Sequence, residues 1–288
     1  MRRLVICADD FGRDIAVNEA VEQAHSNGIL TAASLMVGAP EAADAVARAR
    51  RLPGLGVGLH LVLTDGAPIL PAAEVPALAG PDGAFDPNMI RAGFRFAFSA
   101  RARRQLAAEI RAQFGAFRAT GLVLDHVNAH KHFHLHPTVA RLVVEIGQEY
   151  GMRAVRLPFE PAPPLRAALP GERSRAPAWS PVVASLRRRL DRAGLARNDQ
   201  VFGIAWSGAM VEDRLLALLP HLPDGVSEIY CHPAVCGAAL VPGYRHADEL
   251  TALLSPLVRQ LVAELGLRLV RYRDLTEAPE PARASPAE

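Results

Sequence analysis

The sequence is poor in the features that mark several classes of protein. It has only three cysteines and no Cys-x-x-Cys pair, so we expect no disulfide scaffold, and the cysteine usage is that of a cytoplasmic protein. No run of about 18 apolar residues occurs, so no segment is expected to span a membrane. No Gly-x-Gly-x-x-Gly follows an apolar run, which argues against a dinucleotide site. The net charge of +2 gives no sign of a nucleic-acid partner.

What the sequence does contain is an alternation of short apolar runs with helical patterns. Runs that predict buried strands lie at residues 4–8, 31–37, 56–63, 122–127, 154–157, 201–206, 228–231 and 267–270. The clearest helical patterns between them lie at residues 14–28, 41–51, 100–119, 137–151 and 180–190. Two long segments, 64–98 and 158–178, read as irregular insertions, and connections of that length are usually functional.

This alternation predicts the fold class. Strands that alternate with helices form parallel sheets with crossover connections. About eight such units in roughly 250 residues suit a single (β/α) barrel-like domain, which we place at residues 1–275. A doubly wound open sheet is the alternative. Residues 276–288, rich in Pro, Ala and Glu, are expected to form a disordered C-terminal tail.

Polar side chains gather at the carboxyl ends of the predicted strands. In a barrel these ends converge on one face, where active sites form. In strand order, the residues concerned are Asp9, Asp10, His60, the five histidines of segment 126–136, Arg156, Trp206 and His232.

Several of these side chains are typical ligands of a divalent cation. Two adjacent carboxylates at a buried strand end repel each other, so one of Asp9 and Asp10 usually needs a cation, although a helix N-cap also explains such a pair. His60 alone would more often be a hydrogen-bonded core residue. Five imidazoles within segment 126–136 exceed any structural need. That segment would span over ~30 Å if extended, so only one or two of its histidines can bind one ion; His134 and His136 are not expected among the ligands.

One aspartate and two histidines around a cation with open positions form a hydrolytic site. Such a site also needs a base that takes a proton from water and an acid on the opposite wall. Asp9 and His232 fit these two roles. We expect Arg156, Trp206 and His132, which come from the same strand ends, to contact the substrate.

Four motifs resemble those of the YdjC/ChbG carbohydrate deacetylase family, in the same order, over residues 1 to about 270. They are Ala-Asp-Asp-Phe-Gly, Gly-Leu-His-Leu-Val-Leu-Thr, the His-x-x-x-His-x-His-x-His block and Tyr-Cys-His-Pro. The form of the histidine block is most similar to the hopanoid-biosynthesis branch, HpnK. The resemblance implies a barrel-like α/β fold and removal of the acetyl group from an N-acetylated amino sugar, N-acetylglucosamine linked to a hopanoid lipid.

Carried over residue by residue, the resemblance implies that Asp10, His60 and His130 bind the metal. It implies Mg²⁺, with Zn²⁺ as the alternative, and it makes Asp9 the base. One departure concerns the family's His-x-Asp, which here ends in Asn128. A neutral amide cannot be a charged partner of a ligand, which leaves metal preference and substrate class open.

Two other functions stay open on the sequence: a barrel-type hydrolase of esters or phosphoesters, and a non-catalytic metal-binding protein. Arginines 187, 188, 189 and 192 decorate one helix whose other face is apolar. Such a helix can lie on the inner face of a membrane, which would suit a lipid-linked substrate, but an ordinary solvated face is the reading we favour. A homodimer is also left open.

Overall fold

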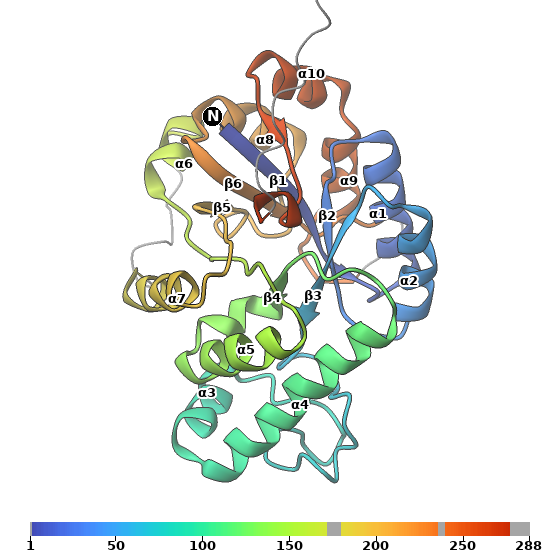
Figure 1. Ribbon diagram of the computed structural model, residues 1–288. Coiled ribbons are helices and arrows are strands. Elements are labelled where there is room, and N and C mark those ends of the chain that lie inside the picture. Colours follow the sequence, from blue (N-terminus) through green and yellow to red (C-terminus); the bar gives the residue numbers. More distant parts are fainter. Residues whose placement is uncertain (1, 172–179, 236–239, 277–288) are drawn as a thin grey trace, which may run out of the picture.

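The first apolar run forms the central strand of the sheet. The computed structural model describes residues 2–171, 180–235 and 240–276, and β1 spans Arg2–Phe11 (Figure 1). All strand pairs are parallel, in the order β4-β3-β2-β1-β6-β5, with β7 also paired to β1. The remaining strands are β2 (Ala32–Leu35), β3 (Gly56–Leu61), β4 (Val127–Ala129), β5 (Gln200–Phe202), β6 (Gly225–Cys231) and β7 (Arg268–Leu269).

The two edges of this sheet are linked, so it curls into a barrel. Isolated parallel bridges join Val127 to Val155 and Ala154 to Ala196, four residues before β5. The Asn198 side chain completes the link, because it accepts from the Leu157 backbone N–H at 2.7 Å and donates to the Leu157 carbonyl at 2.8 Å. The prediction of a barrel-like domain is confirmed, and the open doubly wound sheet is excluded.

Helices connect the strands and surround the sheet (Figure 1). None in the described part of the chain combines the length and apolarity needed to cross a bilayer. The α-helices are α1 (Ile15–Asn27), α2 (Ala42–Arg51), α3 (Met89–Phe98), α4 (Ala100–Ala119), α5 (Pro137–Glu149), α6 (Ala162–Ala168), α7 (Ser180–Arg192), α8 (Glu212–Leu218), α9 (His246–Leu254) and α10 (Pro256–Glu264).

The two faces of β1 meet different cores. Leu4, Ile6 and Ala8 pack in the large apolar core that the helices share. Val5 and Cys7 point the other way, into a smaller cluster. This alternation is the period of two that a strand imposes on its side chains. This smaller cluster lies inside the barrel. There it borders buried polar groups, since the Tyr272 hydroxyl donates to the Glu228 carboxylate.

The structure corrects several predicted elements. The strand expected at 122–127 begins only at Val127, the run 154–157 contributes isolated bridges rather than a strand, and β5 ends at Phe202 rather than at 206. The insertions expected to be irregular contain α3 and α6. The tail predicted from 276 falls almost wholly on 277–288, which, like Cys236, lies outside the described residues.

Candidate metal centre and active site

Three ligand-type side chains meet at the carboxyl end of the sheet. Asp10 comes from the end of β1, His60 from β3 and His130 from the position directly after β4. The Asp10 Oδ1 atom lies 3.4 Å from His60 Nε2 and 3.2 Å from His130 Nδ1. One ligand atom from each residue lies within 4.8 Å of the other two. The strand ends therefore bring together the cluster that the sequence predicted.

The backbone of Asp10 is held in an unusual conformation. Its φ of +65° lies in the left-handed region, which residues other than glycine rarely adopt. Arg13 stabilises it, since its backbone N–H donates to the Asp10 carbonyl at 3.0 Å and its guanidinium to Asp10 Oδ2 at 2.8 Å. Such strain is concentrated at functional sites, and here it aims the free carboxylate oxygen at the two imidazoles.

The cluster fits a divalent cation. Asp10 Oδ1 is buried and has no hydrogen-bond partner, although it faces two imidazole nitrogens. Burial opposes ionisation of Asp10, but His130 and His60 hold its pKa well below the usual range, so it is a carboxylate at neutral pH. A buried anionic oxygen beside two imidazole nitrogens is the donor set of a catalytic metal site with open positions.

Asn128 orients one of the ligands. Its Oδ1 accepts from His60 Nδ1 at 2.6 Å, an arrangement that would leave Nε2 of a neutral His60 ring available to a metal ion beside Asp10. Its Nδ2 donates to Ser34 Oγ at 2.8 Å and to Asp9 Oδ1 at 3.2 Å. The amide thus supplies the positioning that a carboxylate would give, and it adds a donor to Asp9 that a carboxylate lacks.

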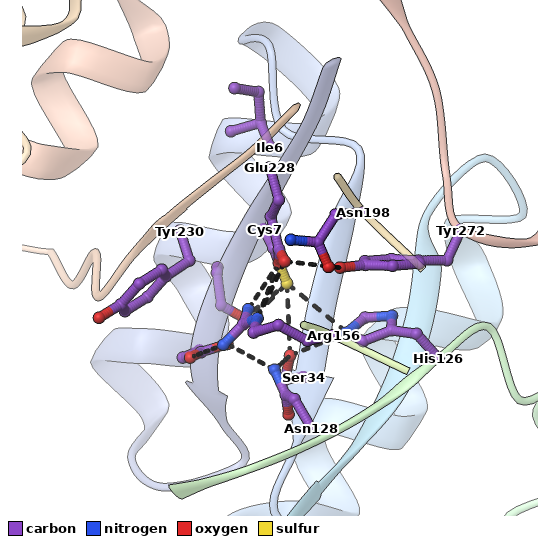
Figure 2. A network of polar contacts seen from close by, with 12 residues as sticks. Ile6, Cys7, Ser34, His126, Asn128, Arg156, Asn198, Glu228, Tyr230 and Tyr272 are labelled. Atoms are coloured by element: carbon purple, nitrogen blue, oxygen red, sulfur yellow. Dashed lines mark hydrogen bonds and ion pairs between the residues drawn. The ribbon is translucent and has the colours of Figure 1, made fainter. Parts of the chain in front are cut away.

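Arg156 lies behind the metal cluster, inside the barrel. Figure 2 shows its guanidinium beside Glu228, which also accepts from the Tyr272 hydroxyl at 2.6 Å. Arg156 binds the Asp9 carboxylate at 2.5 and 2.8 Å and the Glu228 carboxylate at 2.7–3.0 Å. Its side chain is fully buried. The expectation that Arg156 contacts substrate does not match this placement: each of its three guanidinium nitrogens donates to a carboxylate, and it holds Asp9 instead.

Asp9 is consequently ionised and fixed. Burial would raise its pKa, but the Arg156 charge and the neighbouring His60 lower it far below the ordinary value. Its carboxylate faces the cavity on one side and Arg156 on the other.

A cavity of about 900 Å³ opens above the cluster. Arg156 and Trp206 are absent from the lining that the described residues form. Trp206 is instead buried in the turn after β5, under the Arg214 guanidinium at 5.2 Å. Six of the eight predicted site residues line the cavity: Asp9, Asp10, His60, His130, His132 and His232.

His132 and His232 approach the cavity from different strands. His132 sits in a turn in which it and Lys131 both have positive φ, and its Nε2 lies 3.2 Å from the Tyr230 hydroxyl. Burial and the Arg156 charge lower the pKa of His132 well below its usual value, so the ring is neutral. His232 follows β6; its backbone N–H donates to Glu249 and its carbonyl accepts from a neighbouring imidazole, each at 2.5 Å.

Comparison with known proteins identifies the family. Residues 3–264 match the family model described as YdjC-like protein. The chain belongs to the YdjC-like family. A carbohydrate deacetylase of Geobacillus stearothermophilus is 32% identical over 278 residues, covering 95% of this chain and 98% of the relative. A human carbohydrate deacetylase is 31% identical over 320 residues, covering 99% and 94%.

Solved structures share the fold of this chain. An Enterococcus faecalis protein named for cellobiose-phosphate cleavage superposes with a TM-score of 0.75 at 26% identity, covering 95% of this chain and 98% of that one. A lactam utilization protein of Thermus thermophilus has a TM-score of 0.51 at 14% identity, covering 93% and 98%, and shares the fold alone. The match to the family model and the carbohydrate deacetylase relatives confirm the predicted YdjC-like family, whereas the hopanoid-biosynthesis branch stays a prediction.

Sequence reasoning missed residues of this YdjC-like site that act through others. Glu228, which holds Arg156, was not considered, and Asn128 was noted only as a departure from the family motif, although it holds His60; neither is among the residues that line the cavity. The sequence does contain one indication of the role of Glu228. It stands in the apolar run of β6, and a carboxylate that is buried there usually has a charged partner. His134 and His136 lie outside the ligand cluster, and it stays a prediction that neither binds the metal.

The arginine-bearing helix α7 does not offer an apolar face. Val183, Leu186 and Leu190 are buried in the shared core. Arg187 is half-buried, with its guanidinium over the Phe159 ring at 5.1 Å. Because the apolar side is already packed, the solvated-face reading of this helix is the one the contacts favour.

Proposed function

We propose that this protein is a metal-dependent hydrolase that removes the acetyl group from an N-acetylated amino sugar. Its class, carbohydrate deacetylase, is confirmed by curated relatives that cover 95% of the chain. The observation that carries the proposal is the Asp10–His60–His130 cluster at the wall of the cavity. Sugar specificity and the chemical steps are our inference.

The proposed metal ligands are Asp10, His60 and His130. When bound there, a divalent cation would polarise the acetyl carbonyl and acidify a water molecule. The resemblance implied Mg²⁺, but Mg²⁺ prefers oxygen donors, whereas two imidazole nitrogens and one carboxylate suit Zn²⁺ and similar ions. We therefore propose Zn²⁺ or another first-row ion as the better match to these donors.

Two further residues would move the protons. Amide hydrolysis needs a proton removed from water and another delivered to the leaving nitrogen. Asp9 is ionised, adjoins Asp10 and is held by Arg156 and Asn128, so it is placed to accept the first proton. His232 reaches the cavity from β6 with its backbone fixed on both sides, so it is placed to deliver the second.

The cavity wall supports the finer proposal of a sugar linked to an apolar carrier. The residues that line the cavity include Phe159, Ile204, Leu240 and Val241. Apolar side chains there would bury an apolar aglycone. With the resemblance to the hopanoid-biosynthesis branch, this supports a hopanoid-linked N-acetylglucosamine as the substrate.

Acetate release tests the proposal directly. Purified protein would be assayed on free and lipid-linked N-acetylated amino sugars, with matched acetate esters and phosphoesters, after chelation and with added divalent ions. We expect metal-dependent acetate release from the N-acetyl sugars. Turnover of only the esters or phosphoesters would overturn the sugar assignment and favour the other hydrolase class.

The proton-transfer roles need their own variants. Asp9→Asn and His232→Ala should each lower kcat by about 10²–10⁴-fold while metal content is unchanged. A substrate with a good leaving group needs no acid, so it should rescue His232→Ala but not Asp9→Asn. An equal response of both variants to leaving-group pKa would show that the roles are divided wrongly.

A further inference from the structure

An apolar ridge runs along α3, outside the cavity. It consists of Ile90, Phe94 and Phe98, whose exposed fractions are 75%, 62% and 79%. Their spacing of four residues places them on one side of the helix. The rings of Phe94 and Phe98 stack with centroids 6.0 Å apart. Of the seven large apolar side chains exposed in the described part of the chain, three therefore lie on this one helix.

The opposite side of α3 is anchored, so the ridge is not a core face turned outward. Ala92, Gly93 and Phe96 are buried. The Phe96 ring packs against Phe133 at a centroid distance of 5.5 Å. Because the helix has its own buried side, the ridge is additional apolar surface, and contiguous exposed apolar surface usually marks an interaction site.

The surroundings of the ridge are strongly basic. Residues 86–108 contain five arginines and one carboxylate, a net charge of +4. The carboxylate, Asp86, pairs with Arg91 and Arg95 at 2.6 Å each. Arg101 and Arg104 are exposed in the first turns of α4, directly after the ridge. Exposed aromatic side chains bordered by arginines fit a surface that is both apolar and anionic.

We infer that the apolar ridge of α3 docks the protein on an anionic phospholipid bilayer, with Phe94 and Phe98 inserted between the lipids and the arginines against the headgroups. A second copy of the chain is the less suitable occupant. A two-fold contact would place the same patch against itself, and arginines would then face arginines.

This surface adjoins the mouth of the cavity. Met89, at the first position of α3, lines the cavity. Gly93 packs against His136, and Phe96 against Phe133, in the segment that follows His130. Figure 1 shows α3 at the end of the molecule toward which β3 runs. Docking by the ridge would hold the cavity close to the bilayer; it requires no turnover and stands independently of the proposed activity.

Vesicle binding of the full chain tests the inference. Sedimentation with phosphatidylcholine vesicles and with phosphatidylcholine–phosphatidylglycerol vesicles would be measured at low and high salt. We expect binding to the anionic vesicles that weakens as salt is raised, because salt screens the arginines. Absence of binding to anionic vesicles at low salt would overturn the inference.

Variants locate the contact. Phe94→Gln/Phe98→Gln should lower binding at least about tenfold, and Arg101→Gln/Arg104→Gln should lower it about tenfold. The matched control is Leu257→Gln, which removes an exposed apolar side chain (58% exposed) from α10. Its binding should change by less than about twofold. Equal losses in the control and the ridge variant would refute the placement.

Two further readouts keep the test decisive. Phe98→Trp should show fluorescence quenched by brominated lipids in anionic vesicles, and no quenching would contradict insertion. Light scattering of the protein without vesicles should give the same mass for the wild type and for Phe94→Gln/Phe98→Gln. A wild-type dimer that this variant converts to monomer, with no vesicle binding, would assign the ridge to self-association and overturn the bilayer proposal.

Discussion

Replacing Arg156 with methionine tests the role of the buried charge network. The substitution keeps most of the apolar volume but removes the cation between two buried carboxylates. Five hydrogen bonds of 2.5–3.0 Å are lost, and Asp9 and Glu228 then lie in the barrel interior without their partner.

The cost follows from the unpaired charges. Removing one member of a buried ion pair typically destabilises a protein by about 3–5 kcal/mol. For a domain of this size each kcal/mol lowers Tm by about 2–4 °C, so we expect a drop of roughly 10 °C. The matched control is Arg141→Met, which breaks an exposed pair with Glu145. Exposed pairs contribute less than about 1 kcal/mol, so the Tm of this control should change by no more than about 3 °C.

The effect should also depend on pH. In the wild type, burial opposes ionisation of Asp9, but Arg156 lowers its folded-state pKa below the unfolded value. That contribution is full well above the ordinary carboxyl pKa of about 4 and is lost as pH falls below it. Without the arginine, burial raises the pKa of Asp9 in the folded variant. Asp9 then takes up a proton as pH falls, which removes the unpaired buried charge and reduces the loss of stability. The Tm difference should therefore be larger at pH 7 than near pH 4.

Calorimetry in the presence of a chelator measures both quantities. The double variant Arg156→Met/Glu228→Gln should recover part of the loss, since it removes one of the two unpaired carboxylates. If Arg156→Met unfolds at the wild-type temperature, or if its deficit grows as pH falls, the network does not have the role described here.

Two other substitutions test neighbouring contacts. Asn128→Ala should weaken metal binding by roughly 10–100-fold in titration calorimetry, because His60 loses the partner that orients its ring; unchanged affinity would contradict that role. Gly58→Ala should lower stability by about 1–3 kcal/mol in denaturant melts, since its Cβ would approach the His126 ring to about 2.5 Å. The control is Gly115→Ala in α4, where the added Cβ would lie 3.7 Å from the Tyr150 hydroxyl. A comparable loss of stability in this control would refute the steric explanation.

The metal cluster could be predicted because local patterns determine its position. Asp10 and His60 end or follow apolar runs, and the carboxyl ends of parallel strands converge whatever the details of the sheet. The choice of Asp10 rather than Asp9, and of His60 and His130 as the two histidines, came from the family resemblance. For His130 a physical reason is visible only in the structure: Lys131 and His132 adopt positive φ, which turns the chain directly after His130.

The rest depends on contacts between residues far apart in the sequence. Arg156 looked like a cavity residue because it ends an apolar run, but its partner Glu228 is 72 residues away and comes from β6. Helix α3 was missed because Gly93 lies in its middle and phenylalanine is a modest helix former. Packing overrides that propensity: a Cβ at Gly93 would lie 3.3 Å from the His136 ring, so the glycine allows the close approach.

Metal stoichiometry of ligand variants tests the central claim most directly. Chelated wild type, His60→Ala and His130→Ala would be titrated with Zn²⁺ and Mg²⁺, and metal content, acetate release and folding would be measured on the same samples. The exposed Arg141→Met variant serves as the control. The account predicts one tightly bound ion and restored acetate release in wild type and control, and neither in the two folded histidine variants. One tightly bound ion in both histidine variants would contradict it.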